Sequence, residues 1–279
     1  MVKTLMRTRH RSAVVATIVW LQIYAPELMA ENEGVSWAGE LYGGKYYDDS
    51  RVGLYLVSSA QWDNGATFIG EVLHENYTDY EFNGVGAHLL WPVSTFGDVG
   101  LVVSQAWESY EDGSNVDTDY QTRTLALEWE LEQGQWAVAV QAGKYLKDYD
   151  GREPEYLSGD LYFWGNQHDW YLRGATRRIS GASFNLFEGY RVFKLNAHAV
   201  TAYVGMSADD LSFDSPGKDD SVYAGTYAEV FSTPGATLSI WVEAAAEDND
   251  TLFTIELNLA FGAGARTPYI TAFGFSLDD

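Results

Sequence analysis

Cysteine is absent from this 279-residue sequence, which excludes disulfides and a lipid-modified N-terminal cysteine. Basic residues are scarce, because 17 Lys and Arg stand against 40 Asp and Glu and give a formal net charge of −23. Nucleic acid and anionic lipid surfaces are poor partners for so acidic a chain, whereas cations suit it. No apolar run in the sequence is long enough to cross a bilayer as a helix.

Recognisable catalytic motifs are also missing. Four histidines follow the first thirty residues, and none lies in a Gly-x-Ser-x-Gly elbow or a two-histidine metal motif. No glycine loop of the phosphate-binding type precedes a helix pattern. The acidic stretches lack the spacing of a calcium-binding loop, with its central glycine and final glutamate. We therefore expect no enzyme activity, no resident metal and no cofactor.

The N-terminus has the parts of a secretory signal. A basic stretch with Lys3 and three arginines precedes the apolar run 13–24, and a cleavage site near Ala30 follows. We expect residues 1–30 to be removed and residues 31–279 to form one domain. That domain retains 13 Lys and Arg against 39 Asp and Glu.

Apolar and polar residues alternate from about Trp37 to Leu277, most clearly in 125–132 and 253–261. A strand points successive side chains to opposite faces, so each segment has one apolar and one polar face. The candidate strands are 36–47, 52–62, 66–77, 82–91, 99–109, 120–132, 135–147, 156–164, 169–178, 182–191, 193–206, 221–232, 236–246, 251–262 and 267–277. Many are about ten residues or longer, as a tilted strand crossing a bilayer requires.

Short and long connections are sorted along the chain. Tight turns are predicted at 63–65, 133–134 and 234–235, because glycine and asparagine accept the backbone angles of hairpins. Long acidic connections are predicted at 110–119, 148–158 and 208–221, and counting strands in order places them at the opposite end. Short periplasmic turns and long external loops are typical of outer-membrane barrels. The alternative is a secreted β-sandwich with aromatic core pairs.

Together these features resemble Gram-negative outer-membrane β-barrel proteins, in a porin-like way. The last segment adds to the likeness, because Tyr269, Phe273, Phe275 and Leu277 share one face, as in the aromatic-rich final strand of such barrels. The chain departs from that pattern by ending on Asp278-Asp279. The resemblance implies an all-β, antiparallel transmembrane barrel in the outer membrane, in contact with lipid and lipopolysaccharide. The fifteen candidate strands cannot close an antiparallel barrel with both termini on the same side, so one of them is wrong. Twelve or fourteen strands would fit, and we favour fourteen.

If the apolar faces point outward, the opposite faces line the lumen and carry two groups of charge. The expected lumen residues are Glu128, Glu130, Glu132, Glu243 and Glu256 on one side, and Arg173, Arg177, Arg191, Lys194 and His198 on the other. Such groups facing each other would set up a transverse field that steers ions and small solutes. We expect a passive channel for ions or small hydrophilic solutes that prefers cations. The alternative is a non-conducting barrel whose interior charges pair, acting as a scaffold or protein partner in the envelope.

Overall fold

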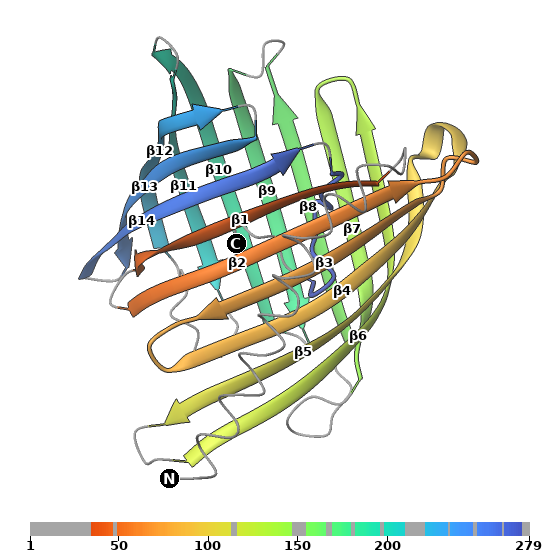
Figure 1. Ribbon diagram of the computed structural model, residues 1–279, viewed down its shortest axis with the longest axis horizontal. Helices are drawn as coiled ribbons and strands as arrows, with labels where there is room; N and C mark the ends of the chain where they lie inside the picture. Colours follow the sequence, from red (N-terminus) through yellow and green to blue (C-terminus); the bar gives the residue numbers. More distant parts are fainter. Residues whose placement is uncertain are drawn as a thin grey trace. The chain divides into compact units, whose positions relative to one another are not determined.

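The computed structural model describes residues 35–46, 49–112, 116–146, 155–165, 169–179, 182–195, 198–209, 221–233, 235–247, 250–263 and 265–274. Within the unit Ser36–Asp279, fourteen strands of the described chain pair in sequence order, and β1 pairs with β14 to close the sheet into a barrel (Figure 1). The strands run antiparallel to their neighbours. The predicted antiparallel barrel of fourteen strands is therefore confirmed.

The strand bounds are β1 Val35–Tyr46, β2 Asp49–Gln61, β3 Thr67–Asn76, β4 Tyr80–Pro92, β5 Asp98–Asp112, β6 Val116–Gln133, β7 Trp136–Tyr145, β8 Glu155–Trp164, β9 Trp170–Ile179, β10 Ala182–Leu195, β11 His198–Asp209, β12 Ser221–Thr233, β13 Ala236–Glu247 and β14 Asp250–Ala263. A 3-10 turn, η1 Ser94–Phe96, precedes β5. Within the described residues, no helix is both long and apolar enough to cross a membrane.

The apolar faces of the strands point outward and the polar faces point inward. In β6, Leu125 and Leu127 are 49% and 63% exposed, whereas Ala126, Glu128 and Glu130 between and beyond them are buried. A soluble protein would bury the leucines and expose the glutamates. The reversed pattern is what a barrel surrounded by lipid requires.

Large aromatic side chains gather at the end of the barrel where the tight turns lie. Trp62, Trp91 and Phe96 are exposed next to the β2–β3 and β4–β5 turns, and Trp170 is exposed where β9 begins. Trp129 donates its indole N–H to the backbone oxygen of Phe96 at 2.6 Å. Rings with one apolar and one polar part are favoured at a membrane–water boundary, so this end has the character of an interfacial belt.

Two of the predicted tight turns close on a left-handed glycine. Gly65 in the β2–β3 turn has φ of 83°, and Gly134 in the β6–β7 turn has φ of 65°. Asn64 supports the first turn by accepting the amide of Ala66 at 3.0 Å. Only glycine adopts such φ values without strain, which is why these positions fix short hairpins.

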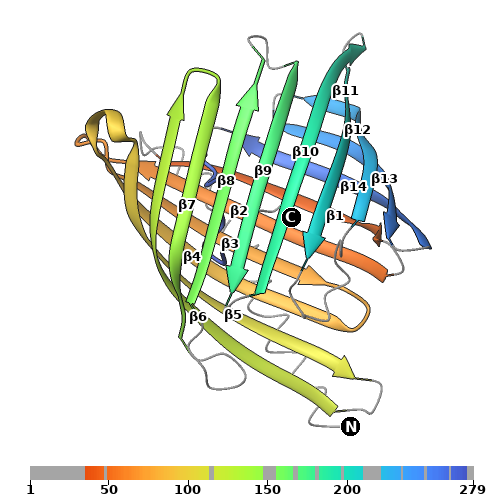
Figure 2. The ribbon, with the colours of Figure 1, turned by 180° about the vertical axis from the view of Figure 1, so that it is seen from behind.

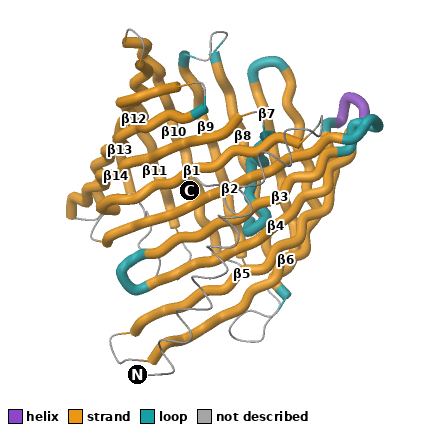
Figure 3. Tube along the Cα trace, in the orientation of Figure 1, coloured by secondary structure: helices purple, strands orange, loops and turns teal. Residues whose placement is uncertain are grey.

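Two sequence-based assignments are wrong. The predicted strand 267–277 is irregular chain throughout its described part, 267–274, and it lies inside the ring of strands (Figure 3). The predicted long connection 110–119 is largely strand, because β5 continues to Asp112 and β6 begins at Val116. Alternation alone cannot separate a wall strand from an extended segment that buries alternate residues within the lumen. The end of the predicted segment, 275–277, lies outside the described residues.

Interior side chains form separate clusters on the two sides of the barrel. One side consists of β2 to β8 and carries Val57, Ile69, Phe82 and Val102 in two clusters that include residues after β14. The other side consists of β9 to β14 with β1, and its cluster is dominated by tyrosine. We call the first side the segment wall and the second side the aromatic wall.

Candidate functional site

The lumen holds the chain's own residues 265–274, named the lumen segment, which run inside the barrel after β14 (Figure 1, Figure 2). The amide of Arg266 donates to Ser59 Oγ at 2.8 Å, and the amide of Ala272 donates to Glu71 Oε2 at 2.6 Å. Three further side chains of the segment wall donate to carbonyl oxygens of the segment: Gln141, Tyr145 and Ser158. Irregular backbone away from water needs such partners, and the wall supplies them through side chains.

Glycines in β4 give the lumen segment room to approach the wall. A Cβ atom at Gly84 would overlap the ring of Phe273, and one at Gly86 would overlap the methyl group of Ala272. Phe273 is buried and packs edge-on against Phe82, with ring centroids 5.3 Å apart. The missing side chains at these two positions therefore create the depression in which the segment lies.

Arg266 anchors the beginning of the lumen segment by two ion pairs. Its guanidinium lies 2.6 Å from Glu130 and 2.7 Å from Asp98. Burial disfavours the charge, but the two carboxylates outweigh burial and raise the pKa of Arg266. Glu130 also accepts the amide of Tyr269 at 3.3 Å, and the hydroxyl of Tyr269 donates to Glu132 at 3.2 Å. β6 thus holds the segment through two carboxylates on its inward face.

A buried histidine connects the lumen segment to the charges of the wall. His88 Nε2 lies 2.7 Å from Glu71, and Nδ1 lies 2.6 Å from Glu128. Glu71 also accepts the hydroxyl of Tyr55 at 2.6 Å and the amide of Ala272. This arrangement fits an imidazolium that donates from both ring nitrogens to two ionised carboxylates. Among the described residues, no group of three or more His, Asp or Glu is placed to hold a metal ion.

The inward arginines of β9 bind carboxylates on the adjacent strands. Arg177 makes a two-point contact with Asp160, at 2.8 and 3.2 Å. Arg173 lies 3.4 Å from Glu188 on β10 and 3.8 Å from Asp160 on β8. These distances place the ion pairs along the wall. The sequence led us to expect groups of opposite charge facing each other across the lumen.

The ten residues expected to line the lumen differ in where the structure places their side chains. Six are buried on the inward face of their strands: Glu128, Glu130, Arg173, Arg177, Glu243 and Glu256. Glu132 is exposed and reaches Tyr269 from the turn end of β6. The side chains of Lys194 and His198 lie outside the described residues.

Arg191 is the clear correction. In β10 the buried residues Leu186, Glu188 and Tyr190 occupy even positions, so the odd position 191 points outward. The side chain of Arg191 is 53% exposed and pairs with Asp169 at 3.1 Å. The expectation that apolar side chains face outward fails in β10, where Leu186 and Tyr190 face inward, and it therefore placed Arg191 on the wrong face. β10 also continues to Leu195, beyond the predicted strand 182–191.

Sequence reasoning missed five charged residues that organise the interior: Glu71, His88, Asp160, Glu188 and Arg266. In β3 the inward neighbours of Glu71 are Ile69 and Leu73, so both faces of this strand are apolar and parity is hard to read. Arg266 was missed because its segment was assigned to the wall. The lumen segment alternates as a wall strand would, so the signal that could distinguish it is the number of buried carboxylates that need donors.

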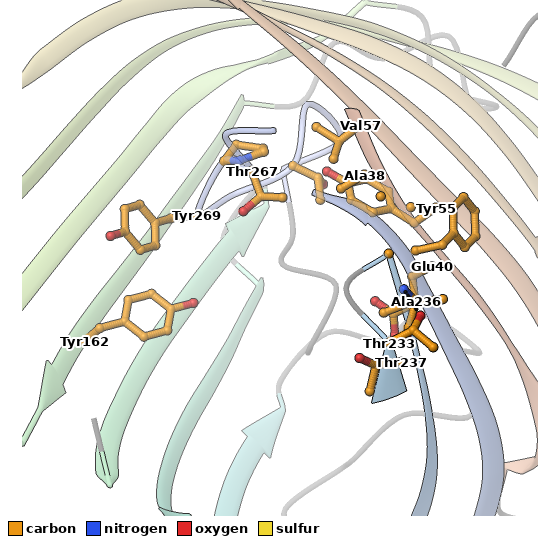
Figure 4. Close-up of a pocket in the computed structure, with 17 residues that line it drawn as sticks. Ala38, Glu40, Tyr55, Val57, Tyr162, Thr233, Ala236, Thr237, Thr267 and Tyr269 are labelled. Carbon is orange, nitrogen blue, oxygen red and sulfur yellow. Dashed lines mark hydrogen bonds between the residues drawn. The ribbon is translucent and has the colours of Figure 1, made fainter. Parts of the chain in front are cut away.

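A cavity of about 480 Å³ lies between the lumen segment and the opposite wall (Figure 4). Tyr162 and Tyr269 lie near each other on one side, with ring centroids 5.2 Å apart, and Glu40 and Tyr55 lie on the other. The walls also contain hydroxyl groups from the β12–β13 turn and from Thr267. The segment therefore fills the lumen on one side and leaves polar space on the other.

Comparisons with known proteins agree with this geometry at the level of fold. No family model matches the sequence, and a search of curated proteins gives no match. Solved structures do match, and the neighbours are outer-membrane β-barrels. The fold is that of an outer-membrane β-barrel. Sequence identity to these neighbours is near a tenth, so the likeness concerns the fold alone.

Two of the structural neighbours show the extent of the match. BamA from Haemophilus ducreyi gives a TM-score of 0.50 at 9% identity, over 84% of this chain and 71% of that chain. CdiB from Acinetobacter baumannii gives 0.54 at 8% identity, over 82% of this chain and 60% of that chain. This outer-membrane-type barrel therefore spans less than two thirds of the CdiB chain.

Proposed function

We propose that the protein is an outer-membrane channel for ions or small hydrophilic solutes, and that its lumen segment closes it in the conformation described here. The observation that carries this proposal is the position of residues 265–274 inside the barrel, bound mainly through polar groups of the segment wall. The interior of an eight-stranded barrel is just wide enough for its own side chains, and the diameter grows with strand number. A barrel of fourteen strands therefore encloses additional space. Polar contacts in an aqueous lumen can be exchanged for water, so displacement of the segment would open a conducting path.

Cation preference is part of the proposal. Carboxylates outnumber cationic groups on the inward faces, where Arg51, His88, Arg173 and Arg177 are joined by Arg266 of the segment. The inward carboxylates include Glu40, Glu71, Glu75, Asp98, Glu108, Glu128, Glu130, Asp160, Glu188, Glu243 and Glu256. A lumen with excess negative charge raises the local concentration of cations.

A non-conducting scaffold in the envelope is the second candidate, with outer-membrane lipid, lipopolysaccharide or a protein as its partner. The burial of Ile270, Ala272 and Phe273 favours it, because these side chains hold the segment by apolar contacts that water cannot replace. The ion pairs around His88 and Arg177 also fit a permanently filled interior. Both candidates share the same fold and differ in whether the segment leaves the lumen.

Conductance in a planar bilayer under a salt gradient tests the proposal. The full chain is compared with a chain that ends at Ala263, and heat-dependent gel migration shows that both barrels are folded. We expect rare or small current steps from the full chain and frequent, larger, cation-selective steps from the shortened chain. Silence from a folded, inserted, shortened barrel would establish the scaffold and reject the channel.

A further inference from the structure

A continuous row of aromatic rings crosses the aromatic wall and extends to the β3–β4 connection. Its members are Tyr171, Tyr190, Tyr203, Tyr227, Trp241, Tyr46, Tyr77 and Tyr80, in spatial order. Successive ring centroids are separated by between 4.0 and 6.1 Å. The row starts near the turn end at β9 and reaches the opposite end at the β3–β4 turn. Tyr171, Tyr227 and Trp241 occupy inward positions and are only half-buried, so their exposed parts face the lumen.

Carboxylates accompany this aromatic row. Glu188 accepts the hydroxyls of Tyr190 and Tyr223 at 2.6 and 2.7 Å, and Glu243 accepts the hydroxyl of Tyr203 at 2.6 Å. The faces of aromatic rings carry partial negative charge, and the carboxylates add full charges beside them. A surface of this composition attracts cations, and the rings favour cations with an organic surface.

One cation of the protein already occupies such a position. The guanidinium of Arg51 lies 4.6 Å from the ring centroid of Tyr42, 4.9 Å from that of Tyr46 and 5.6 Å from that of Tyr77. It also pairs with Glu75 at 2.6 Å. The end of the row near the β3–β4 turn thus binds a guanidinium group through aromatic faces and one carboxylate.

The next position along the row has the same components. The ring centroids of Tyr46 and Trp241 lie 6.0 Å apart. Glu256 is the register partner of Trp241 on the neighbouring strand. Glu256 is 2% exposed, and its Oε1 has no hydrogen-bond partner. Thr254, the register partner of Tyr46, is fully buried, and its hydroxyl also has no partner. A buried carboxylate oxygen without a donor is unfavourable, and a bound donor would relieve it.

The charges around Glu256 also favour a bound cation. The charged groups that act on it are Arg51, Glu75, Glu40 and Glu243. Arg51 is already paired with Glu75, so the remaining carboxylates leave this part of the aromatic wall negative. The contacts of the lumen segment described above are with β2 to β8, and the cavity separates it from β1 and from β12 to β14.

We propose that Glu256 and Thr254, between the rings of Tyr46 and Trp241, bind a small organic cation bearing a guanidinium or alkylammonium group. The cation donates hydrogen bonds to Glu256 Oε1 and to the hydroxyl of Thr254, while its carbon-bound surface lies against the two rings. The aromatic row then forms a path of similar sites along the lumen. This inference rests on the proposed channel function and names its solute class.

Isothermal titration calorimetry of the detergent-solubilised full chain tests the site, with butylguanidinium as the probe and butylurea as its neutral counterpart of similar shape. We expect binding of butylguanidinium and none of butylurea. Glu256→Gln should weaken binding by about tenfold or more, because it removes the charge from the hydrogen bond. Trp241→Leu should weaken it roughly 3- to 30-fold through loss of the cation–ring contact. Glu155→Gln serves as the matched control, since that side chain is 76% exposed on β8.

The outcomes separate this inference from the proposed function. Binding that is unchanged in both Glu256→Gln and Trp241→Leu, or equal binding of butylurea, overturns the site. Binding of Mg²⁺ that displaces butylguanidinium identifies an inorganic cation site and also overturns it. If Glu256→Gln fails to fold by gel migration, Trp241→Leu and Thr254→Val decide the question. Because calorimetry needs no current, a bound cation in a silent barrel supports the site and rejects only the channel.

Discussion

Glycines leave space for other side chains on both walls of this barrel, but different parts of the chain fill that space on the two walls. On the segment wall, Gly84 and Gly86 leave space that the lumen segment fills with Phe273 and Ala272. On the aromatic wall, glycines leave space that tyrosines of neighbouring strands fill. A Cβ atom at Gly225 would overlap the Tyr203 ring, and Gly205 has the same relation to Tyr223. The first wall therefore receives a separate length of chain, whereas the second packs against its own side chains.

The charges of the two walls differ in the same way. On the segment wall, carboxylates such as Glu71 and Glu130 accept backbone amides and cations of the lumen segment. On the aromatic wall, Glu188 and Glu243 accept tyrosine hydroxyls of the wall itself. A wall that bonds its own side chains keeps its structure when the segment leaves. The comparison predicts that the segment wall controls opening and that the aromatic wall controls which solute passes.

The largest effect is expected where the two walls meet. Asp160 on β8 binds Arg177 and lies near Arg173, both of which are buried. Asp160→Ala leaves the positive charges of two buried guanidinium groups without enough negative charge nearby. Breaking a buried ion pair in this way lowers the free energy of unfolding by about 3–5 kcal/mol. Urea unfolding in detergent measures the loss. The control is Glu155→Ala on the same strand, whose exposed pair with Lys144 contributes at most about 1 kcal/mol. Equal losses in the two variants would contradict the ion-pair assignment.

A second prediction separates the walls directly. Gly86→Val places a branched side chain where Ala272 now lies, so the segment is expelled or the wall is strained by up to about 3 kcal/mol. We expect larger and more frequent current steps, and cleavage of the segment by added protease. Gly225→Val on the aromatic wall is the matched control, because it displaces Tyr203 and leaves the segment in place. If both variants open the channel equally, the division of roles between the walls is wrong.

The sequence predicts the strands of the wall better than it predicts the position of the lumen segment. Alternation in β6 and β14 identified the strands, the outward leucines and the inward Glu128, Glu130 and Glu256, because each strand carries its own two-residue period. The position of the lumen segment was not readable, since Tyr269 and Phe273 alternate as wall residues would. Its place is set by long-range contacts with Glu71 and Glu130, more than 130 residues away in sequence. Arg191 was assigned to the lumen because β10 carries Leu186 and Tyr190 on its inward face, which reverses the expected assignment of the two faces.

A third prediction concerns the tyrosine hydroxyls. The hydroxyl of Tyr203 donates to Glu243 at 2.6 Å and accepts the indole N–H of Trp241 at 2.5 Å, in buried surroundings. Tyr203→Phe removes both bonds and should lower the free energy of unfolding by about 1.5–2 kcal/mol. Tyr269→Phe is the counterpart on the lumen segment, where the bond to Glu132 at 3.2 Å lies close to solvent, and we expect less than about 1 kcal/mol. A larger loss for Tyr269→Phe would show that the segment contributes more to stability than the aromatic wall.

The smallest effect is expected outside the lumen. Arg191 points away from the interior and makes one exposed ion pair with Asp169, so Arg191→Ala should change stability by less than about 1 kcal/mol. Ion selectivity of the opened channel should stay unchanged, because a charge on the outer face is screened from the path by the wall. Arg177→Gln is the contrasting variant, since Arg177 lies inside on the adjacent strand and its charge adds to the lumen potential. Reversal potentials under a salt gradient measure both variants. A shift with Arg191→Ala as large as that with Arg177→Gln would mean that strand parity does not define the lumen, and the solute path would have to be placed elsewhere.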